Sequence, residues 1–325
     1  MAEAIKRQSG DVIDVTASAA RTAAEVAQAP DGRAGVYPVA ADSGARASLE
    51  TEGVFRVLKT ADIVMLAGQE IYWDHSAGTA TYWATNDKDF YLGVVQKDAA
   101  GSDTTVDVKL NDRAACVFSA GAAGPEGAAR TVVVLTAGTP SFLRSGSSHI
   151  GKFSLTAEAQ KLDLLSLRSV PVASKWVWQG VGTVIADADA DVGDLSFGMA
   201  DGTHASDADT ITTSAFFHIN MSGADLKIYG ESDNAAAEVA ATDTTKVFAV
   251  GTPFHLMIDG RSGDGSGLKY YVNGIRVLSG TAFTVAGAAG PLKALFHLEK
   301  SANDSPGEVA LDDMRLWLQD DAAAA

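Results

Sequence analysis

The chain is poor in cysteine and in basic residues, and each shortage excludes a class of protein. A single cysteine, Cys116, among 325 residues excludes an intrachain disulfide framework and a cysteine-built zinc site, and we expect it to be a small buried apolar residue. Only 25 Lys and Arg stand against 41 Asp and Glu, which gives a net charge of −16. Such a chain is not expected to bind nucleic acid, which needs basic side chains against its phosphates, or anionic membranes.

Long hydrophobic runs are also missing. No uninterrupted stretch reaches the ~20 apolar residues of a membrane-spanning helix. The N-terminal segment MAEAIKRQSGDVIDV has no apolar stretch of the length found in secretory signals. We therefore expect a soluble product made in a cytoplasm.

What the sequence does contain is apolar material divided by many turns. Hydrophobic residues make up 46% and charged residues 20%, with 32 glycines and 8 prolines. This composition supports packed cores and short elements rather than disorder or long helices. The length suggests two domains of ordinary size or one large one.

Residues 1–112 are predicted to form a small β-domain. Short runs rich in β-branched and aromatic residues alternate with turn sequences such as Pro30-Asp31-Gly32 and Gly101-Ser102-Asp103. Strands of this length and spacing are typical of a small barrel or sandwich. Residues 113–150 contain stretches of small residues without periodicity, so we interpret them as a linker. Within them, the run at 131–135 indicates a strand that cannot be assigned to either domain.

Residues 151–320 are predicted to form an antiparallel β-sandwich, followed by a frayed tail at 321–325. About ten further strand-like runs occur here, and Asn273-Gly274 between two of them is a strong hairpin signal. The only helical candidate is the segment from Thr156 to Ser166. The glycine-rich stretch at 260–267 joins two expected strands, so we interpret it as a flexible loop rather than a phosphate site.

An alternation of Asp with Ala is the one pattern that suggests a metal. Asp187, Asp189 and Asp191 are spaced like the first ligands of a calcium loop, but Val192 and Gly198 stand where an EF-hand needs glycine and glutamate. A solvated loop or strand edge would give the same pattern. The same alternatives hold for a second acidic set, Asp201, Asp207 and Asp209. Apart from this possible calcium ion, we expect no cofactor.

No catalytic arrangement is evident. The six histidines lack the spacing of a metalloprotease helix and lie in no Gly-x-Ser-x-Gly context: His75, His149, His204, His218, His255 and His297. The last three lie in strand-like runs, where hydrogen-bonded sheet histidines are expected rather than ligands. Trp176 and Trp178 would share one face of a strand, which favours core packing over a sugar-stacking platform.

The order of elements in the N-terminal part resembles the small β-domain of tailed-phage capsid decoration (cement) proteins. The resemblance covers roughly residues 8–111 and rests on five segments: 10–15 (GDVIDV), 49–57 (LETEGVFRV), 68–74 (GQEIYWD), 91–95 (YLGVV) and 103–110 (DTTVDVKL). It implies a β-barrel or β-tulip-like fold.

The C-terminal half, residues 150–319, resembles concanavalin-like jelly-roll domains. The segments that carry this resemblance are 156–160 (TAEAQ), 195–198 (LSFG), 270–274 (YYVNG) and 311–316 (LDDMRL). Many such domains bind glycans, but no sugar site of the family can be assigned residue by residue here. The expected fold class is therefore all-β, a small N-terminal β-domain followed by an antiparallel jelly-roll sandwich.

Together the resemblances imply a structural protein of the virion, located on the outer capsid surface. Its partners would be the phage major capsid protein and two further copies of itself, with a host-surface glycan as a possible third. Residues 1–15 are predicted to be an arm that is mobile in the free protein and adds a strand to the capsid protein, with Ile5, Val12, Ile13 and Val15 as contacts. A carbohydrate-binding module and a β-sandwich glycosidase are the alternatives.

Overall fold

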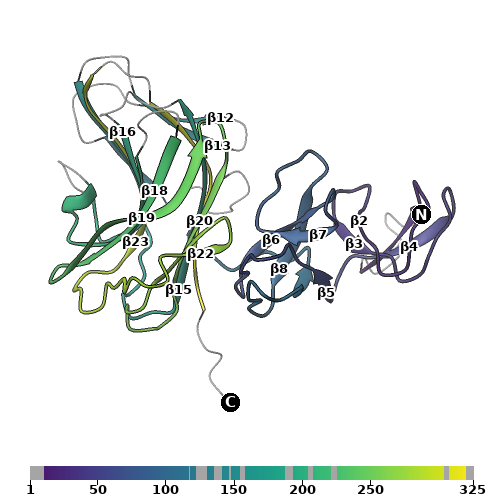
Figure 1. Ribbon diagram of the computed structural model, residues 1–325. Helices are drawn as coiled ribbons and strands as arrows, with labels where there is room; N and C mark the ends of the chain where they lie inside the picture. The colour runs from purple at the N-terminus through teal and green to yellow at the C-terminus, as the bar shows by residue number, and fades with distance from the viewer. Residues whose placement is uncertain are drawn as a thin grey trace, which may run out of the picture. The chain divides into compact units, whose positions relative to one another are not determined.

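The computed structural model describes residues 11–116, 118–121, 130–134, 141–145, 148–153, 158–186, 193–203, 208–220, 225–303 and 307–319. The chain divides between Ala115 and Cys116 into two compact units (Figure 1). Nearly all regular structure is antiparallel β, and the one helix among the described residues is a single 3-10 turn, η1 (Ala208–Thr210). The prediction of an all-β protein is confirmed. Cys116, expected to be buried, is half-buried.

The N-terminal unit contains two small sheets. The four-stranded sheet has the order β1-β4-β3-β2, and the five-stranded sheet has the order β5-β9-β8-β6-β7. The five-stranded sheet curls until the Thr60 N–H, just after β5, donates to the Ala80 carbonyl oxygen in β7 (2.9 Å). This contact between the two edges gives the barrel-like closure that the sequence predicted. The strands are β1 (Val12–Thr16), β2 (Val26–Gln28), β3 (Ala34–Val36), β4 (Arg46–Glu50), β5 (Val54–Leu58), β6 (Glu70–Asp74), β7 (Thr79–Thr81), β8 (Phe90–Val95) and β9 (Thr105–Leu110).

Two loops of the four-stranded sheet repeat one conformation 20 residues apart. Arg21 and Ala41 exchange both backbone hydrogen bonds, at 2.7 and 3.0 Å, where the two loops meet. Ala24 and Gly44 occupy equivalent positions and both have positive φ, 65° and 78°. Glycine adopts this conformation freely, whereas alanine is strained in it. The first loop therefore carries strain that the second avoids.

One side chain ties the two sheets of this unit together. Asn111 follows β9 with φ 56°, a conformation that asparagine tolerates better than most residues. Its side-chain amide donates to the Ala34 carbonyl (2.9 Å) and the Thr51 carbonyl (2.6 Å), and its Oδ1 accepts from the Ala34 N–H (2.9 Å). Ala34 and Val36 of β3 belong to the same apolar cluster as the five-stranded sheet. The sheets thus share a core as well as this polar tie.

The C-terminal unit is a sandwich of two antiparallel sheets. One has the order β11-β14-β23-β16-β17-β18-β19, and the other has the order β12-β13-β24-β15-β20-β21-β22 with β10 also paired to β24. This arrangement confirms the predicted jelly-roll sandwich. The strands are β10 (Phe118–Gly121), β11 (Arg130–Val134), β12 (Ser141–Ser145), β13 (Ser148–Lys152), β14 (Glu158–Ser166), β15 (Trp176–Ala186), β16 (Gly193–Ala200), β17 (Thr213–Asn220), β18 (Asp225–Asn234), β19 (Glu238–Ala249), β20 (Phe254–Gly260), β21 (Lys269–Val272), β22 (Ile275–Val277), β23 (Lys293–Asn303) and β24 (Glu308–Leu318).

Aromatic side chains from both sheets fill the sandwich. Trp178 of β15 meets Phe197 of β16 edge to face, with 4.8 Å between ring centroids. Gly180 makes room for this contact, because a Cβ there would lie 2.4 Å from Phe197 Cε1. Trp176 and Trp178 are fully buried, so the prediction that they pack in the core is confirmed. Burial of one such ring stabilises the fold by roughly 2–3 kcal/mol.

Two local predictions are wrong. Residues 113–150 are not a linker, because β10, β12 and most of β13 lie in this range and pair in the β24 sheet, while β11 pairs with β14 in the other. The unassigned run near 131–135 is thus a strand of the sandwich. The helical candidate from Thr156 to Ser166 is largely strand β14. Residues 160–164 of this strand are all buried, so side chains on both of its faces are packed. Its leucines therefore do not mark one face of a helix. The tail at 321–325 lies outside the described residues.

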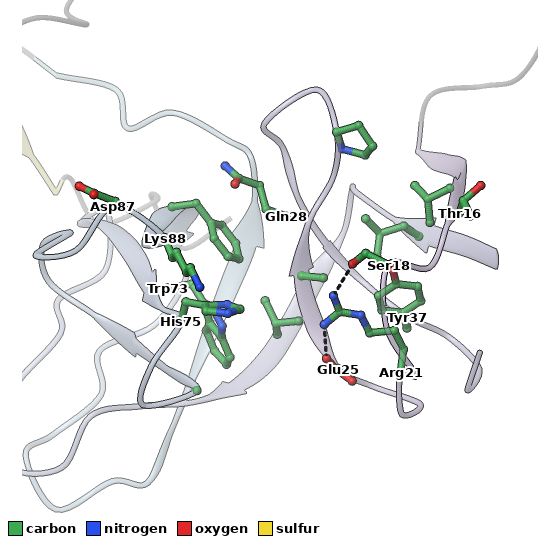
Figure 2. A pocket seen from close by; sticks show the side chains of 17 residues that line it. Thr16, Ser18, Arg21, Glu25, Gln28, Tyr37, Trp73, His75, Asp87 and Lys88 are labelled. Carbon is green, nitrogen blue, oxygen red and sulfur yellow. Dashed lines mark hydrogen bonds and ion pairs between the residues drawn. The ribbon is translucent and has the colours of Figure 1, made fainter. Parts of the chain in front are cut away.

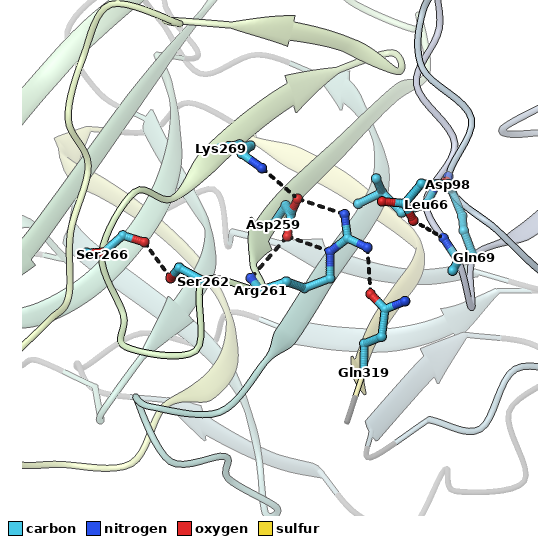
Figure 3. Close-up of polar contacts among 10 residues, drawn as sticks. Leu66, Gln69, Asp98, Asp259, Arg261, Ser262, Ser266, Lys269 and Gln319 are labelled. Atoms are coloured by element: carbon cyan, nitrogen blue, oxygen red, sulfur yellow. Dashed lines mark hydrogen bonds and ion pairs between the residues drawn. The ribbon is translucent and has the colours of Figure 1, made fainter. Parts of the chain in front are cut away.

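The hairpin prediction is confirmed. Asn273 and Gly274 have φ values of 50° and 74° and connect β21 to β22, as expected for a primed turn. The glycine-rich loop precedes β21 and no helix follows it. At its base Asp259 lies buried and accepts a two-pronged ion pair from Arg261, at 2.8 and 3.0 Å (Figure 3). Bonds within the loop itself, such as Ser262 Oγ to the Ser266 carbonyl (2.6 Å), give it defined turns.

Candidate functional site

The first candidate site is the outer edge of β1. Among the described strands, β1 pairs only with β4. The Thr51 N–H donates to the Asp11 carbonyl (2.7 Å) at one end, and the Ala17 N–H donates to the Ala45 carbonyl (2.9 Å) at the other. Backbone bonds alternate in direction along an antiparallel strand, so the odd-numbered residues of β1 bond to β4. The even-numbered residues direct their N–H and C=O groups the other way.

The open edge presents the backbone of Val12, Asp14 and Thr16. The side chains of these three residues are also exposed. The Val12 N–H already donates to its neighbour Asp11 Oδ1 (3.2 Å), whereas Asp14 reaches across the sheet to Arg46 (2.7 Å) through its side chain alone. An extended segment of another chain could therefore add to this edge, bonding to Asp14 and Thr16 without displacing any bond to β4.

This geometry corrects the predicted arm. Val12, Ile13 and Val15 belong to a paired strand rather than to a free segment. Val15 is buried and Ile13 packs against the same small cluster, which also contains Tyr37 and Leu49. Burial of alternate residues against this cluster explains why β1 folds with its own unit. Only Val12 keeps an exposed side chain, and Ile5 lies outside the described residues.

The second candidate site is a groove of about 510 Å³ between the two sheets of the N-terminal unit (Figure 2). β1, β2 and the first repeated loop form one wall, and β6 and the turn before β8 form the other. Tyr37, Trp73 and Phe90 contribute mostly buried rings. Arg21 and Lys88 contribute positive charge to the same groove, and Glu25 and Asp87 contribute negative charge. An apolar floor with charged walls suits a polypeptide better than a small uncharged ligand.

Arg21 is held in place on its wall of the groove. Its guanidinium donates to Glu25 (2.7 Å) and to Ser18 Oγ (3.1 Å), and lies 5.9 Å from the centre of the Tyr37 ring (Figure 2). Burial alone would raise the pKa of Glu25, but hydrogen bonds from the Thr22 N–H and from Arg21 lower it. The sequence analysis did not predict this groove. The one local signal in the sequence is the i, i+4 spacing of the ion pair between Arg21 and Glu25, and in the structure this pair lies within a loop.

Exposed apolar side chains mark a further surface of the unit. Val54 and Leu58 of β5 are 58% and 57% exposed, and β5 is the outer strand of its sheet. Arg56 between them forms a two-pronged pair with Asp107 (2.8 and 3.0 Å). Large exposed aliphatic residues on the outside of a strand are typical of a surface that another chain covers.

The sequence-derived candidates of the sandwich do not form one site. Asp187, Asp189 and Asp191 lie outside the described residues, so the calcium site stays a prediction. Among the strand histidines, His297 is hydrogen-bonded to Asp163 and Glu299, as expected of a sheet histidine. His255 is buried in β20, and burial lowers its pKa to about 3. His218 has different surroundings and is considered below.

Among the described residues, no helix is long and apolar enough to cross a membrane.

The N-terminal unit has a recognisable relationship to known proteins. Residues 7–110 match the phage cement protein family. These bounds agree with the resemblance over residues 8–111 and with the compact unit that ends at Ala115. They leave the sandwich outside the match. No curated protein sequence matches the chain.

Solved structures similar to the chain have 10–13% sequence identity and TM-scores near 0.4. One is the carbohydrate recognition domain of Emp46p in its potassium-bound form (11% identity, TM-score 0.40, 59% of this chain and 89% of that one). Another is a carbohydrate esterase from the Shiga toxin-encoding bacteriophage phi24B (13% identity, TM-score 0.41, 63% and 99%). The strand order of the C-terminal unit, rather than these similarities, defines its fold.

Proposed function

We propose that the chain is a cement protein of a phage virion, bound to the outer capsid surface through its N-terminal unit. The family match over residues 7–110 supports this role. The observation that carries it is the open edge of β1, which offers backbone donors and acceptors to an extended segment of the major capsid protein. Main-chain bonds of this kind supply affinity without a deep pocket.

The groove beside β1 would receive side chains of the same capsid segment. Val15 and Thr16 of β1 line it together with Arg21 and Lys88. A strand added to β1 would therefore run along the rim of the groove. A segment with an apolar residue and a charged residue would complement the Trp73 floor and the charged walls. Contact along both the edge and the groove would fix the register of the bound segment.

The exposed residues of β5 would be covered by a neighbouring copy. We propose a homotrimer, in which Val54 and Leu58 contribute to the contact between copies. Three capsid contacts in one particle would act together through effective concentration, so that modest affinity per contact gives firm attachment. The high negative charge would keep the free particles apart before they assemble on the shell.

The sandwich would be displayed on the virion as a structural domain rather than an enzyme. The Trp176 and Trp178 pair cannot serve as a sugar platform because both rings are buried. Glycan binding therefore has no observation of its own among the described residues, and capsid attachment is the function that the geometry supports best.

Capsids that lack this protein provide the test. The full chain is added to them, and occupancy is measured by sedimentation and by electron microscopy of the particles. Saturable binding at fixed lattice positions, with density next to the capsid protein explained by residues 11–115, would support the proposal. Free protein in the supernatant at every ratio would contradict it. A variant lacking residues 2–10 distinguishes attachment through an N-terminal arm from attachment through the edge of β1. We expect edge binding through β1 to survive the deletion.

A further inference from the structure

The outward face of the seven-stranded sheet carries a row of polar side chains. The inward face of the same strands supplies the sandwich core, for example Phe197, Phe217 and Phe296. On the opposite face Ser196 of β16 lies directly between His297 of β23 and His218 of β17. The two histidines thus occupy matching positions on either side of one serine, each with acidic neighbours.

His297 has all its polar contacts at hydrogen-bonding distance. Its Nδ1 contacts Asp163, and its Nε2 is 2.8 Å from Glu299 Oε2. Lys161 completes the group with an ion pair to Glu299 at 2.6 Å. In this network both ring nitrogens of His297 are already bonded to carboxylates, so neither is available to a ligand.

His218 lies among acids at longer distances. Its Nε2 is 3.4 Å from Asp194 Oδ1, its Nδ1 is 4.0 Å from Asp209 Oδ1, and Ser196 Oγ is 3.5 Å from the same Nδ1. Charge-assisted hydrogen bonds are normally about 2.7–2.9 Å long. The ring nitrogens of His218 thus have several acceptors nearby, but all of them lie farther away than 2.9 Å.

A third acid lies close to the imidazole. Glu231 of β18 is the diagonal cross-strand neighbour of His218, two residues beyond its direct partner Tyr229. One carboxylate oxygen of Asp209, one of Glu231 and a ring nitrogen of His218 lie within 4.8 Å of one another. The Tyr229 ring packs edge-on against the imidazole, with 6.2 Å between centroids, and limits its rotation.

We propose that Asp209, His218 and Glu231 bind a divalent transition-metal ion, for which zinc is the reference. The imidazole nitrogen favours zinc, nickel or cobalt over calcium and magnesium, which prefer oxygen ligands alone. Two carboxylates supply the negative charge. Three protein ligands leave a coordination position open to water or to an acidic group of a ligand.

Asp194 would be the positioning residue of this site. It lies on the Nε2 side of the ring, so it would accept the Nε2 proton and direct Nδ1 to the metal. Carboxylates commonly orient metal-binding histidines in this way. Burial alone would lower the pKa of His218, but Asp194 and the charges of Glu231 and Asp209 raise it to about 9. The same carboxylates would attract a metal cation, which must displace the proton from Nδ1 to bind there.

The ligands need only a small movement to close around an ion. Zinc bonds of about 2.0–2.2 Å place neighbouring donors roughly 3.3 Å apart. His218 and Glu231 are fixed on adjacent strands, whereas Asp209 lies exposed on the short turn η1. Movement of Asp209 toward the sheet would complete the site and attach η1 to β17 and β18.

The test uses the full chain without a histidine tag, stripped of metal with a chelator. Zinc is titrated by calorimetry, and cobalt serves as the spectroscopic probe. We expect one zinc ion per chain, and cobalt absorption bands that zinc abolishes. The variants Asp209→Asn and His218→Gln should each weaken zinc binding at least tenfold. Asp225→Asn, an exposed acid at the start of β18 outside the cluster, is the matched control and should bind as the wild type does.

Nuclear magnetic resonance of the imidazole nitrogens tests the geometry directly. Zinc should shift the Nδ1 signal of His218 and leave a proton on Nε2, and Asp194→Asn should weaken binding about 10–100-fold. The proposal is overturned if zinc does not bind, or if it binds Asp209→Asn and His218→Gln as tightly as the wild type. Binding of calcium but not zinc at this cluster would also overturn it. Asp209 is exposed, so its replacement should leave the metal-free fold intact, which the melting temperature verifies.

Discussion

The two units of this chain are stabilised in different ways. Among the described residues, the fully buried aromatic side chains all lie in the sandwich, whereas the fully buried apolar side chains of the N-terminal unit are aliphatic or methionine, such as Leu49 and Met65. The strands of the first unit have three to six residues, whereas those of the second reach twelve. The sandwich therefore depends on side-chain burial, and the N-terminal unit depends more on turns and on polar ties such as Asn111. The smaller unit has a small hydrophobic core, yet its β1 edge and its groove are open to other chains.

The largest expected effect is a cavity in the sandwich. Phe197→Ala should destabilise the sandwich by about 3–5 kcal/mol, because it removes a buried ring that packs against Trp178 and Phe296. Calorimetry of the full chain should show one transition lowered and the transition of the N-terminal unit unchanged. If both transitions shift together, the two units are not independent and the comparison fails.

The matching variant in the N-terminal unit removes a polar tie instead of a ring. Asn111→Ala should cost about 2–4 kcal/mol, because it leaves three buried or half-buried backbone groups without their hydrogen bonds and places alanine at φ 56°. Asn111→Gly removes the same bonds without the backbone strain, so it should cost less. Equal stability of wild type and Asn111→Gly would show that the strain, not the tie, matters.

The stability of the sandwich should depend on pH because the pKa values of its buried histidines are shifted. Burial opposes charge on His297, but Asp163 and Glu299 outweigh it and raise its pKa to about 9. A raised folded-state pKa gives stabilisation that is complete below the ordinary pKa near 6.5 and is lost as the pH rises through about 9. His297 alone should therefore weaken the sandwich transition by about 2–3 kcal/mol between pH 6.5 and 9.5.

His255 has the opposite effect. Its pKa of about 3 means that it stays neutral when folded, so stability is lost as the pH falls from 6.5 toward 3. Melting curves across both ranges check the two signs. His297→Gln should remove about half of the alkaline slope and leave the acid slope, because His218, whose pKa is also raised to about 9, contributes the rest. An alkaline slope unchanged by this variant would contradict the assignment.

The smallest expected effects concern the repeated loops of the N-terminal unit. Ala24→Gly should stabilise this unit by up to about 1 kcal/mol because it relieves the positive φ, and Gly44→Ala should destabilise it by a similar amount. A Cβ at residue 44 would meet no atom within 4 Å, so conformation alone sets the sign. Denaturant melts that give the same sign for both variants would refute the equivalence of the two loops.

Local sequence signals predicted the elements that depend on local chemistry. The Asn273-Gly274 turn and the core position of Trp176 and Trp178 follow from turn geometry and from strand alternation. Residues 113–150 could not be assigned in this way, because β10 and β13 join the sandwich by pairing with β24, far along the chain, and β11 joins it by pairing with β14. β14 lacks alternation for a related reason, since both of its faces are buried.

The candidate site was predictable only in part. The family resemblance located it in the N-terminal unit, and the alternation of Val12, Ile13 and Val15 indicated a strand. The sequence could not show that β4 already occupies one edge of that strand. The groove and the cluster around His218 each join residues from separate strands and loops, so no local spacing reveals them.

The central claim is that the open edge of β1 holds the protein on the capsid. Occupancy of capsids by full-length Asp14→Pro and Asp14→Ala tests it most directly. Both variants lose the exposed ion pair with Arg46, but only proline removes the outward N–H of Asp14, and neither loses a bond to β4. We predict that Asp14→Ala binds within about twofold of the wild type and that Asp14→Pro loses affinity at least tenfold. Equal occupancy by the two variants, with the N-terminal unit folded in both, would contradict the account.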